Sequence, residues 1–550
     1  MNPLLELKNL GVSYRTGGGE VTAVRGVGLR LEPGGTLGVA GESGSGKSTV
    51  AMSVLRLLPR SAKVTGEILL DGEDVTAMRW GRLRAVRWAE ASVVFQGAMH
   101  ALNPVRRIGE QIAEPIRLHP PGDKAPTDAE VDARVAELLR QVDLPPGRAG
   151  AYPHELSGGQ KQRVMIAMAL ACSPRLIIAD EPTTALDVIV QAQVLALLGK
   201  LVHEQGIGLI MISHDLSVLA ATCERIAVMY DGEIVEEGPS AELMSAPRHE
   251  HSRALAAAFP TVGDPVSRFA PATSTPLPPE PENRGAPGGT PLLAAKDLRV
   301  GFRDRTGKRI QAVAGVDLAV HRDEIVALVG QSGSGKTTLA RTLLGLQKPD
   351  SGEVTYDGDP VPSGGAGLRA YRRQVQLVLQ DPASALNPAH TVYEAVAEGP
   401  RIHGLADERA TVLKALEAAE LRPPEKFLGR LPHELSGGQR QRVVIAGALA
   451  LEPSVLVADE PVASLDASVR GEILGLLLRL RRQLGLAALV ITHDLGLAWN
   501  IADRVAVMYR GELVETGTVE QVLLDPHHDY TKSLLAALPG GTAARTAADR

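Results

Sequence analysis

Short apolar runs alternate with longer amphipathic stretches along this chain, and the alternation occurs in both halves. Residues 36–40 (TLGVA) and 325–329 (IVALV) are predicted to be buried strands, because each is a short apolar run that leads into a glycine-rich loop. A stretch with helical periodicity follows each loop, KSTVAMSVLRLL in the first half and KTTLARTLLGL in the second. Further short apolar runs directly precede Asp180, His214, Asp459 and His493. Strands that alternate with helices predict an α/β fold with a mainly parallel sheet in each half.

Charged amphipathic stretches interrupt this alternation at the same place in each half. DAEVDARVAELLRQV lies between residues 103 and 156, and ERATVLKALEAAE lies between residues 387 and 435. Their apolar residues recur at helical spacing and the remaining positions are polar, which is typical of surface helices. Each half is therefore expected to contain a helical insertion.

Three motifs recur in the same order in the two halves. They are GESGSGKS (41–48) with GQSGSGKT (330–337), LSGGQ (156–160 and 435–439), and IIADEP (177–182) with LVADEP (456–461). Lys336 lies 289 residues after Lys47, whereas the later motifs all recur after 279 residues. This constant spacing indicates a duplication, and it predicts two nucleotide sites in one chain.

The length of 550 residues agrees with more than one domain, since single cores rarely grow beyond roughly 250–300 residues. We expect one domain over residues 1–259, a second over 292–539 and a disordered tail over 540–550. The Pro-rich stretch over 260–291 has no apolar periodicity, which predicts an extended linker.

Composition narrows the class of protein. A hydrophobic share of 44% and a charged share of 22% are typical of a globular protein, and the net charge of −6 disfavours broad nucleic-acid binding. No apolar run approaches the roughly 18–20 residues that cross a bilayer, and the first residues lack the pattern of a signal peptide. Cys172 and Cys223 lack the spacing of metal ligands and are expected to pack as small hydrophobic side chains. These features favour the cytoplasm, with any membrane role exerted through a partner.

The glycine-rich loops have the pattern G-x-x-x-x-G-K-[ST] between a predicted strand and a helix, which is the context of a phosphate-binding P-loop. Glycines let successive backbone N–H groups converge on phosphate oxygens, the lysine reaches the β- and γ-phosphates, and the residue after it binds Mg²⁺. The predicted ATP-binding residues are Gly41, Ser43, Gly44, Gly46, Lys47, Ser48 and Thr49 in the first half and Gly330, Ser332, Gly333, Gly335, Lys336, Thr337 and Thr338 in the second.

An Asp-Glu pair follows an apolar strand in each half, so the carboxylates should emerge beside the P-loop at the carboxyl edge of the sheet. Asp180 and Asp459 are expected to bind Mg²⁺ directly or through water, together with Ser48 and Thr337. Glu181 and Glu460 are expected to act as general bases that activate the attacking water.

The LSGGQ motifs distinguish this chain from other nucleotide hydrolases. Each opens a long amphipathic helix, so its first residues form a second anion site at a helix N-terminus. These residues are Ser157, Gly158 and Gly159 in the first half and Ser436, Gly437 and Gly438 in the second. With these motifs in this order, the chain resembles the ATP-binding cassette (ABC) ATPases of ABC transporters over nearly everything except the linker and the tail.

The resemblance implies two tandem P-loop NTPase domains, each with a RecA-like α/β core, a helical subdomain and a small antiparallel β part. It implies that the signature of one cassette caps the ATP held by the other, so that Lys47 shares an ATP with Ser436 and Lys336 shares one with Ser157. It also assigns Q-loop glutamines, which sense Mg²⁺ and water, to Gln96 and Gln380, switch histidines to His214 and His493, and adenine-stacking aromatics to Tyr14 and Phe302.

Both halves keep every motif, so both sites are expected to hydrolyse ATP. The halves differ in the loop after the carboxylates, which reads TALD (184–187) in the first and ASLD (463–466) in the second. They also differ after the Q-loop glutamine, where Gly97 corresponds to Asp381. Communication between the two sites is therefore expected to be asymmetric.

Other segments resemble the ATPases of oligopeptide and dipeptide importers. Among them are residues 163–198, ALNP after each Q-loop, and HHDYTKSLLAALP (527–539). This resemblance implies that one fused chain serves a transporter, at the cytoplasmic face of the membrane, with two transmembrane permease subunits and an extracytoplasmic solute-binding protein. Peptides are the expected cargo, while nickel, opines or glutathione-like solutes are alternatives. Some relatives carry a cysteine cluster for an iron–sulfur centre, and we expect no such cluster here.

Twin cassettes without membrane spans also occur in ABC translation factors and in DNA-repair ATPases. The former have a long charged helical linker and the latter have zinc-binding cysteines, whereas this linker is Pro-rich and this chain has only two cysteines. The importer interpretation is therefore favoured over both.

Overall fold

The computed structural model describes residues 2–95, 97, 101–120, 124–184, 186–279, 289–303, 307, 309–463 and 465–539. The chain divides into two compact units, one built on residues up to Ala256 and one running from Ala257 to Ala536. Each unit contains one copy of every motif found in the sequence.

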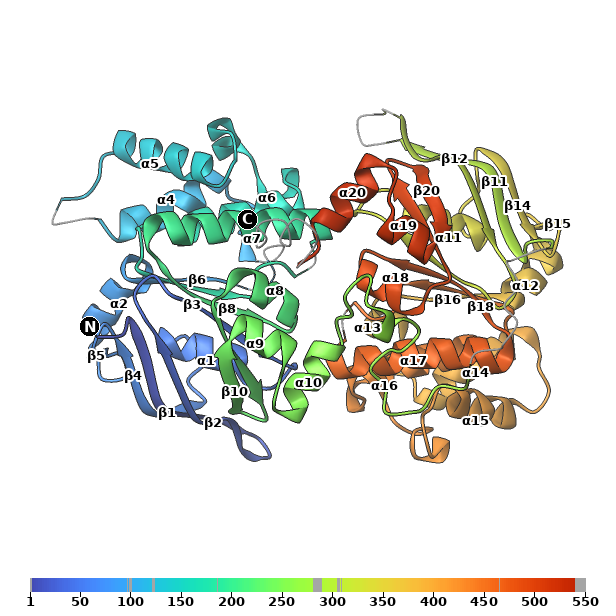
Figure 1. The fold of residues 1–550 in the computed structure, drawn as a ribbon, viewed down its shortest axis with the longest axis horizontal. Coiled ribbons are helices and arrows are strands. Elements are labelled where there is room, and N and C mark those ends of the chain that lie inside the picture. Colours follow the sequence, from blue (N-terminus) through green and yellow to red (C-terminus); the bar gives the residue numbers. More distant parts are fainter. Residues whose placement is uncertain are drawn as a thin grey trace. The chain divides into compact units, whose positions relative to one another are not determined.

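The first unit is built on two sheets (Figure 1). The four-stranded antiparallel sheet has the order β2 (Gly19–Leu31), β1 (Leu5–Thr16), β4 (Ala62–Leu70) and β5 (Glu73–Asp74). The six-stranded sheet has the order β10 (Glu233–Pro239), β9 (Arg225–Tyr230), β3 (Thr36–Gly41), β8 (Gly208–Ser213), β7 (Leu176–Asp180) and β6 (Ala91–Val94). All of its neighbouring strands are parallel except β9 and β10. The predicted parallel strands before the P-loop, the Asp-Glu pair and the histidine are thus confirmed as β3, β7 and β8.

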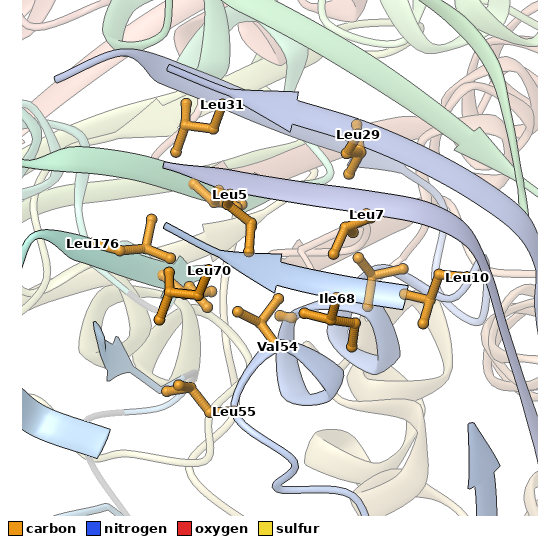
Figure 2. Close-up of a cluster of buried hydrophobic side chains, with 14 of the residues drawn as sticks. Leu5, Leu7, Leu10, Leu29, Leu31, Val54, Leu55, Ile68, Leu70 and Leu176 are labelled. Carbon is orange, nitrogen blue, oxygen red and sulfur yellow. The ribbon is translucent and has the colours of Figure 1, made fainter. Parts of the chain in front are cut away.

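The core of this unit lies between the sheets and the helix after the P-loop. Leu5 and Leu10 of β1, Ile68 of β4 and Val54 of α1 (Lys47–Val54) are all at most 2% exposed. Figure 2 shows these side chains meeting between the strands and the helix. Because α1 is anchored in this core, the loop that precedes it is held at a fixed place on the sheet edge.

The remaining helices of the first unit fall into two groups. The helical insertion consists of α4 (Ile108–Leu118), α5 (Asp128–Gln141) and α6 (Gly158–Ala169), which pack together. Thr127 and Glu130 cap α5 with a reciprocal capping box. The other helices are α2 (Trp80–Ala89), α7 (Val188–Gln205), α8 (Leu216–Thr222), α9 (Ser240–Ser245) and α10 (Glu250–Ala257).

The second unit repeats this architecture. Its antiparallel sheet has the order β12 (Arg309–Val320), β11 (Leu293–Arg303), β14 (Ser351–Tyr356) and β15 (Asp359–Pro360). Its six-stranded sheet has the order β16 (Val375–Val378), β17 (Val455–Asp459), β18 (Ala487–Thr492), β13 (Ile325–Val329), β19 (Arg504–Tyr509) and β20 (Glu512–Thr518). Its helices are α11 (Lys336–Leu343), α12 (Gly365–Gln374), α13 (Pro382–Ala385), α14 (Val392–His403), α15 (Glu408–Ala418), α16 (Gly437–Leu449), α17 (Ala467–Leu484), α18 (Leu495–Ile501), α19 (Val519–Leu524) and α20 (Asp529–Ala536).

Much of the segment predicted to be a linker packs against the second unit. We call residues 259–279 the strap. The indole N–H of Trp499 in α18 donates to the Asp264 carbonyl at 2.9 Å, and the Phe269 N–H donates to the Asn500 carbonyl at 2.9 Å. Arg268 forms an ion pair with Glu520 at 2.9 Å. The strap is therefore a structured part of the second unit, and the rest of the predicted linker up to residue 288 lies outside the described residues.

Two glycines of α17 let the strap approach the helix backbone. A Cβ at Gly471 would lie 1.8 Å from the Ala272 carbonyl oxygen, and a Cβ at Gly475 would lie 3.0 Å from Thr273. Beside them, Glu472 accepts hydrogen bonds from the Thr273 hydroxyl at 2.9 Å and the Ser274 N–H at 2.5 Å. We call Gly471 and Gly475 the glycine track, because they leave room for the strap on the helix surface. The carboxylate of Glu472, between them, binds the strap.

No helix in the part of the chain that the structure describes is both long and apolar enough to span a membrane.

Candidate functional site

The first P-loop joins β3 to α1, and its glycines adopt conformations that other residues rarely take. Gly41 and Gly46 have φ angles of 150° and 99°. A Cβ at these positions would lie 2.4 Å from the Met229 carbonyl oxygen and 2.6 Å from the Ala23 carbonyl oxygen. Glycine is therefore required at both positions, because β9 and the antiparallel sheet lie too close to the loop for a side chain.

The second P-loop, between β13 and α11, has the same constraint. A Cβ at Gly330 would lie 2.2 Å from the Met508 carbonyl oxygen, and a Cβ at Gly335 would lie 2.1 Å from the Ala312 carbonyl oxygen. Both loops thus form the same cradle of backbone N–H groups at the N-terminus of a helix.

Each P-loop lysine is buried and lies over its own loop. The ammonium group of Lys47 donates to the Glu42 carbonyl at 2.6 Å and to the Ser45 hydroxyl at 3.3 Å. The ammonium group of Lys336 donates to the Gly330 carbonyl at 2.6 Å and to the Gln331 carbonyl at 2.9 Å. The positive charge is therefore placed at the centre of each cradle. The other predicted loop residues lie around it, with Ser43 and Ser332 exposed and Gly44 and Gly333 at φ angles of 79°.

The predicted metal ligands are adjacent in each unit. The Asp180 carboxylate is hydrogen-bonded to Ser48, and the Thr337 hydroxyl donates to Asp459 at 3.1 Å. Burial raises the pKa of both aspartates above the ordinary value, and the neighbouring glutamate adds to the rise. One oxygen of Asp180 is buried and has no hydrogen-bond partner among the described residues. A buried carboxylate with an unsatisfied oxygen beside a hydroxyl fits a hard cation such as Mg²⁺.

The glutamate after each aspartate contacts the histidine after the next strand. His214 Nδ1 lies 3.2 Å from Glu181 Oε1, and His493 Nδ1 lies 2.7 Å from Glu460 Oε1. The two glutamates have φ angles of 44° and 49°, a conformation that is uncommon outside glycine. Such strained backbone clusters at functional sites, and here it directs the glutamate side chain toward the histidine.

The contact between Glu181 and His214 shifts the pKa of both side chains. Burial alone would raise the pKa of Glu181, but the hydrogen bond and the charge of His214 lower it below the ordinary value. The same hydrogen bond raises the pKa of His214, although burial opposes this. Burial lowers the pKa of His493, but its hydrogen bond to Glu460 outweighs that effect and the pKa is raised. Glu181 is thus held as a carboxylate, the form that a general base needs.

The two sites differ in the residue that supports the glutamate. In the first unit the Thr184 hydroxyl donates to the second carboxylate oxygen of Glu181 at 2.8 Å. The corresponding residue in the second unit is Ala463, which has no hydroxyl, and the Thr492 hydroxyl lies 3.5 Å from Glu460. The difference between TALD and ASLD therefore changes a direct contact to the glutamate carboxylate.

The signature residues begin α6 and α16. Ser157 caps α6 by accepting the Gln160 N–H at 3.3 Å, and Ser436 caps α16 by accepting the Gln439 N–H at 3.2 Å. A Cβ at Gly159 or at Gly438 would lie 2.3 Å from a valine side chain of α7 or α17. Gly158 and Gly437 precede them in the first turn. Each signature helix thus packs closely against the helix that follows the Asp-Glu pair.

The predicted adenine platforms differ in their surroundings. Tyr14 is partly buried, and its hydroxyl is hydrogen-bonded to the Thr49 hydroxyl at 3.1 Å. A cavity of about 520 Å³ next to it is lined by Tyr14, Ser48, Thr49 and Phe95, among others. Phe302, at the end of β11, is 42% exposed. Thr338, the predicted counterpart of Thr49, lies in the first turn of α11. Phe95 was not predicted as a site residue, although its aromatic side chain directly before the Q-loop was a usable signal.

The Q-loop glutamines are described in one unit only. Gln380 is exposed and follows β16, and the next residue, Asp381, caps α13 through the Ala383 N–H at 2.9 Å. Gln96 lies outside the described residues.

Two P-loops, two strained Glu-His pairs and two capped signature helices define an ATPase with duplicated ABC-type cassettes. The family model described as "ABC transporter" matches residues 24–184 and 313–463, and the model described as "Oligopeptide/dipeptide transporter, C-terminal region" matches residues 514–549.

Curated relatives extend this match over almost the whole chain. The "Glutathione import ATP-binding protein GsiA" of Salmonella typhimurium (strain LT2) is 42% identical over 563 residues, which cover 98% of this chain and 89% of the relative. The protein of the same name from Escherichia coli (strain K12) is 42% identical over 564 residues, with the same coverage. A solved dimeric structure of the ATP-binding cassette MJ0796 with ADP and Pi is 31% identical, covers 42% of this chain and 99% of that chain, and has a TM-score of 0.38.

The chain therefore belongs to the ABC transporter family. It is an ATP-hydrolysing subunit of the oligopeptide/dipeptide importer type, and the predicted fold of two tandem α/β cassettes is confirmed.

Proposed function

We propose that this chain energises the import of short peptides, with glutathione among the candidate solutes. The observation that carries the proposal is the match to importer ATPases over 98% of the chain together with the oligopeptide/dipeptide C-terminal region. Glutathione, which the relatives' name specifies, is itself a small peptide, so the two indications agree in chemical class. Nickel and opines remain the alternatives from the wider family.

The proposed ATP sites are shared between the two cassettes. Lys47 binds the phosphates of one ATP and the signature at Ser436 caps it, while Lys336 and Ser157 form the other site. Each signature supplies the N-terminus of a helix to the γ-phosphate. Because a closed pair of cassettes binds ATP better than an open pair, binding favours closure and hydrolysis reverses it.

Within each site, the chain's own residues position water and charge. Asp180 with Ser48, and Asp459 with Thr337, would hold Mg²⁺, which neutralises the phosphate oxygens when bound. Glu181 and Glu460 accept a proton from the attacking water, and His214 and His493 orient these carboxylates. Gln96 and Gln380 would sense the metal and the water, and Tyr14 and Phe302 would stack on adenine.

The proposed partners are two permease subunits and an extracytoplasmic solute-binding protein, with the chain peripheral at the cytoplasmic face of the membrane. No nucleic acid and no iron–sulfur cluster take part. One fused chain supplies both ATPase cassettes of the transporter.

Photoaffinity labelling tests the pairing of the sites. Ser436→Arg in the full chain should prevent trapping of 8-azido-ATP in the cassette of Lys47 and leave the cassette of Lys336 labelled, as shown by peptide mapping. The mirror variant Ser157→Arg is the matched control and should give the opposite pattern. Loss of label in the same cassette as the mutated serine would refute the shared sites.

Uptake measurements test the cargo. Cells with and without the chain should differ in accumulation of labelled dipeptide and labelled glutathione, and not in accumulation of nickel. Uptake of nickel alone would replace the peptide assignment with the metal alternative.

A further inference from the structure

A tyrosine of the C-terminal helix contacts the second P-loop. The Tyr530 hydroxyl, on α20, accepts a hydrogen bond from the backbone N–H of Gln331 at 2.8 Å. Tyr530 is only 7% exposed, and its ring stacks on Tyr509 at the end of β19, with ring centroids 4.2 Å apart. Burial and stacking therefore fix the position of the phenol ring, and its hydroxyl contacts the second residue of the loop.

The segment that carries Tyr530 is itself anchored to the sheet. Glu515 of β20 accepts the N–H of His527 at 2.8 Å and the N–H of His528 at 3.2 Å. His528 Nδ1 in turn accepts the Tyr530 N–H at 3.1 Å. In Figure 1, α20 lies beside β20 in the second unit. A chain of hydrogen bonds thus fixes Tyr530 relative to the strands that carry the P-loop.

Gln331 connects this tyrosine to the catalytic lysine. Its N–H binds Tyr530, while its carbonyl accepts a hydrogen bond from the Lys336 ammonium group at 2.9 Å. A loop that is already ordered loses less conformational entropy when it binds phosphate. Tyr530 therefore acts on nucleotide binding through the loop backbone and the lysine.

The first cassette has the same scaffold with a different residue. His251 takes the place of Tyr530, 279 residues earlier, and its ring lies 4.4 Å from Tyr230. Glu236 accepts the N–H groups of Arg248 at 2.8 Å and of His249 at 2.9 Å, as Glu515 does in the second cassette. However, His251 Nε2 is buried and makes no hydrogen bond to any described residue. This ring atom does not reproduce the bond from Tyr530 to the loop.

We propose that Tyr530 is a positioning residue for the ATP site that contains Lys336, and that the first cassette, which has His251 at this position, lacks this bond from a phenol to the loop. The proposal rests on ATP binding by the second P-loop. It assigns to the C-terminal region a role in setting the relative ATP affinities of the two cassettes.

Tyr530→Phe is the informative variant because it removes the hydroxyl and keeps the ring on Tyr509. In full-length chains carrying Lys47→Ala to disable the first loop, Tyr530→Phe should raise the Kd for a fluorescent ATP analogue roughly 3- to 10-fold, the range for loss of one hydrogen bond. The rate at saturating ATP should stay within a factor of about two, since the hydroxyl touches no reacting atom. Tyr393→Phe is the matched control, because its hydroxyl donates to Glu408 at 2.7 Å on the helical insertion.

Hydrogen–deuterium exchange of the nucleotide-free protein gives a second measurement that does not depend on ATP. The Gln331 amide should exchange about tenfold faster in Tyr530→Phe than in the wild type or in Tyr393→Phe. An unchanged exchange rate would overturn the proposal even if ATP binding is normal. Faster exchange in a protein whose wild-type second loop binds no ATP would instead refute the proposed function of that site. Equal Kd values for Tyr530→Phe and the control would likewise refute the positioning role.

Discussion

Gly471→Ala should detach the strap from the second cassette. Residue 471 lies inside α17, where alanine is compatible with the helix, but the added Cβ would lie 1.8 Å from the Ala272 carbonyl oxygen. A backbone atom at that distance has to move. The first cassette has Ala192 at the corresponding position of α7, so the substitution gives α17 the residue that its counterpart helix already has.

The magnitude follows from the contacts that the strap would lose. Arg479 donates to the Thr275 carbonyl at 2.9 Å, and Glu472 accepts the Thr273 hydroxyl at 2.9 Å. Hydrogen bonds to charged groups contribute about 1.5–3 kcal/mol each, so losing these two costs about 3–4 kcal/mol at the lower end of that range. The higher helix propensity of alanine stabilises α17 equally whether the strap is attached or detached, so it does not offset this loss. The loss of about 3–4 kcal/mol should raise the population of the detached strap roughly 150- to 900-fold.

Limited trypsinolysis measures this population. Arg268 has a side chain that is 14% exposed in an ion pair with Glu520, so cleavage after it requires local opening. The initial cleavage rate at Arg268, followed by mass spectrometry, should rise in Gly471→Ala by the factor given above. Gly199→Ala in α7 is the matched control, because a Cβ there meets no atom within 4 Å. If Gly471→Ala were cut at the wild-type rate, the strap would not depend on the glycine track.

Two further predictions concern the catalytic pairs. Glu181→Gln and Glu460→Gln should each lower steady-state ATP turnover by roughly 100-fold at the mutated site, because general-base catalysis contributes about 10²–10⁴-fold. An unchanged rate in either single variant would mean that this site is silent. The pKa of His214 is raised by Glu181, so the stability from this pair is present below the ordinary histidine pKa and is lost as the pH rises through the folded value. Glu181→Gln should therefore lower the pKa of His214 in an NMR titration, and a pKa that did not fall would contradict the assigned contact.

The strands and loops of each cassette could be predicted from the sequence because their signals are local. An apolar run that leads into G-x-x-x-x-G-K-[ST] specifies a buried strand, a cradle and a helix within about 20 residues. The Asp-Glu pairs follow the same rule, since their strands are short and buried on both faces. Sequence spacing alone did not indicate that each glutamate would reach the histidine 33 residues later, although the family resemblance identified both residues.

The strap could not be predicted, because it has no periodic pattern and its anchors are distant in the chain. Arg479 lies 204 residues after the carbonyl that it binds. A Pro-rich sequence predicts an extended segment, but it does not indicate whether that segment is free in solvent or packed on a surface. The glycines at 471 and 475 were the available signal, since α7 has Ala192 and Ala196 at the corresponding positions.

The differences between the cassettes lie beside the shared motifs, in contact with residues that carry them. In the second cassette Arg470 forms an ion pair with Asp494, the residue after His493, and the guanidinium lies 5.1 Å from the ring of Phe259 at the start of the strap. The first cassette has Gln191 at the position of Arg470. Arg470 therefore joins the start of the strap to the loop that carries His493, so a movement of the strap would be transmitted to the residue next to that histidine. Two cassettes with the same motif residues can therefore differ in rate because the residues around those motifs differ.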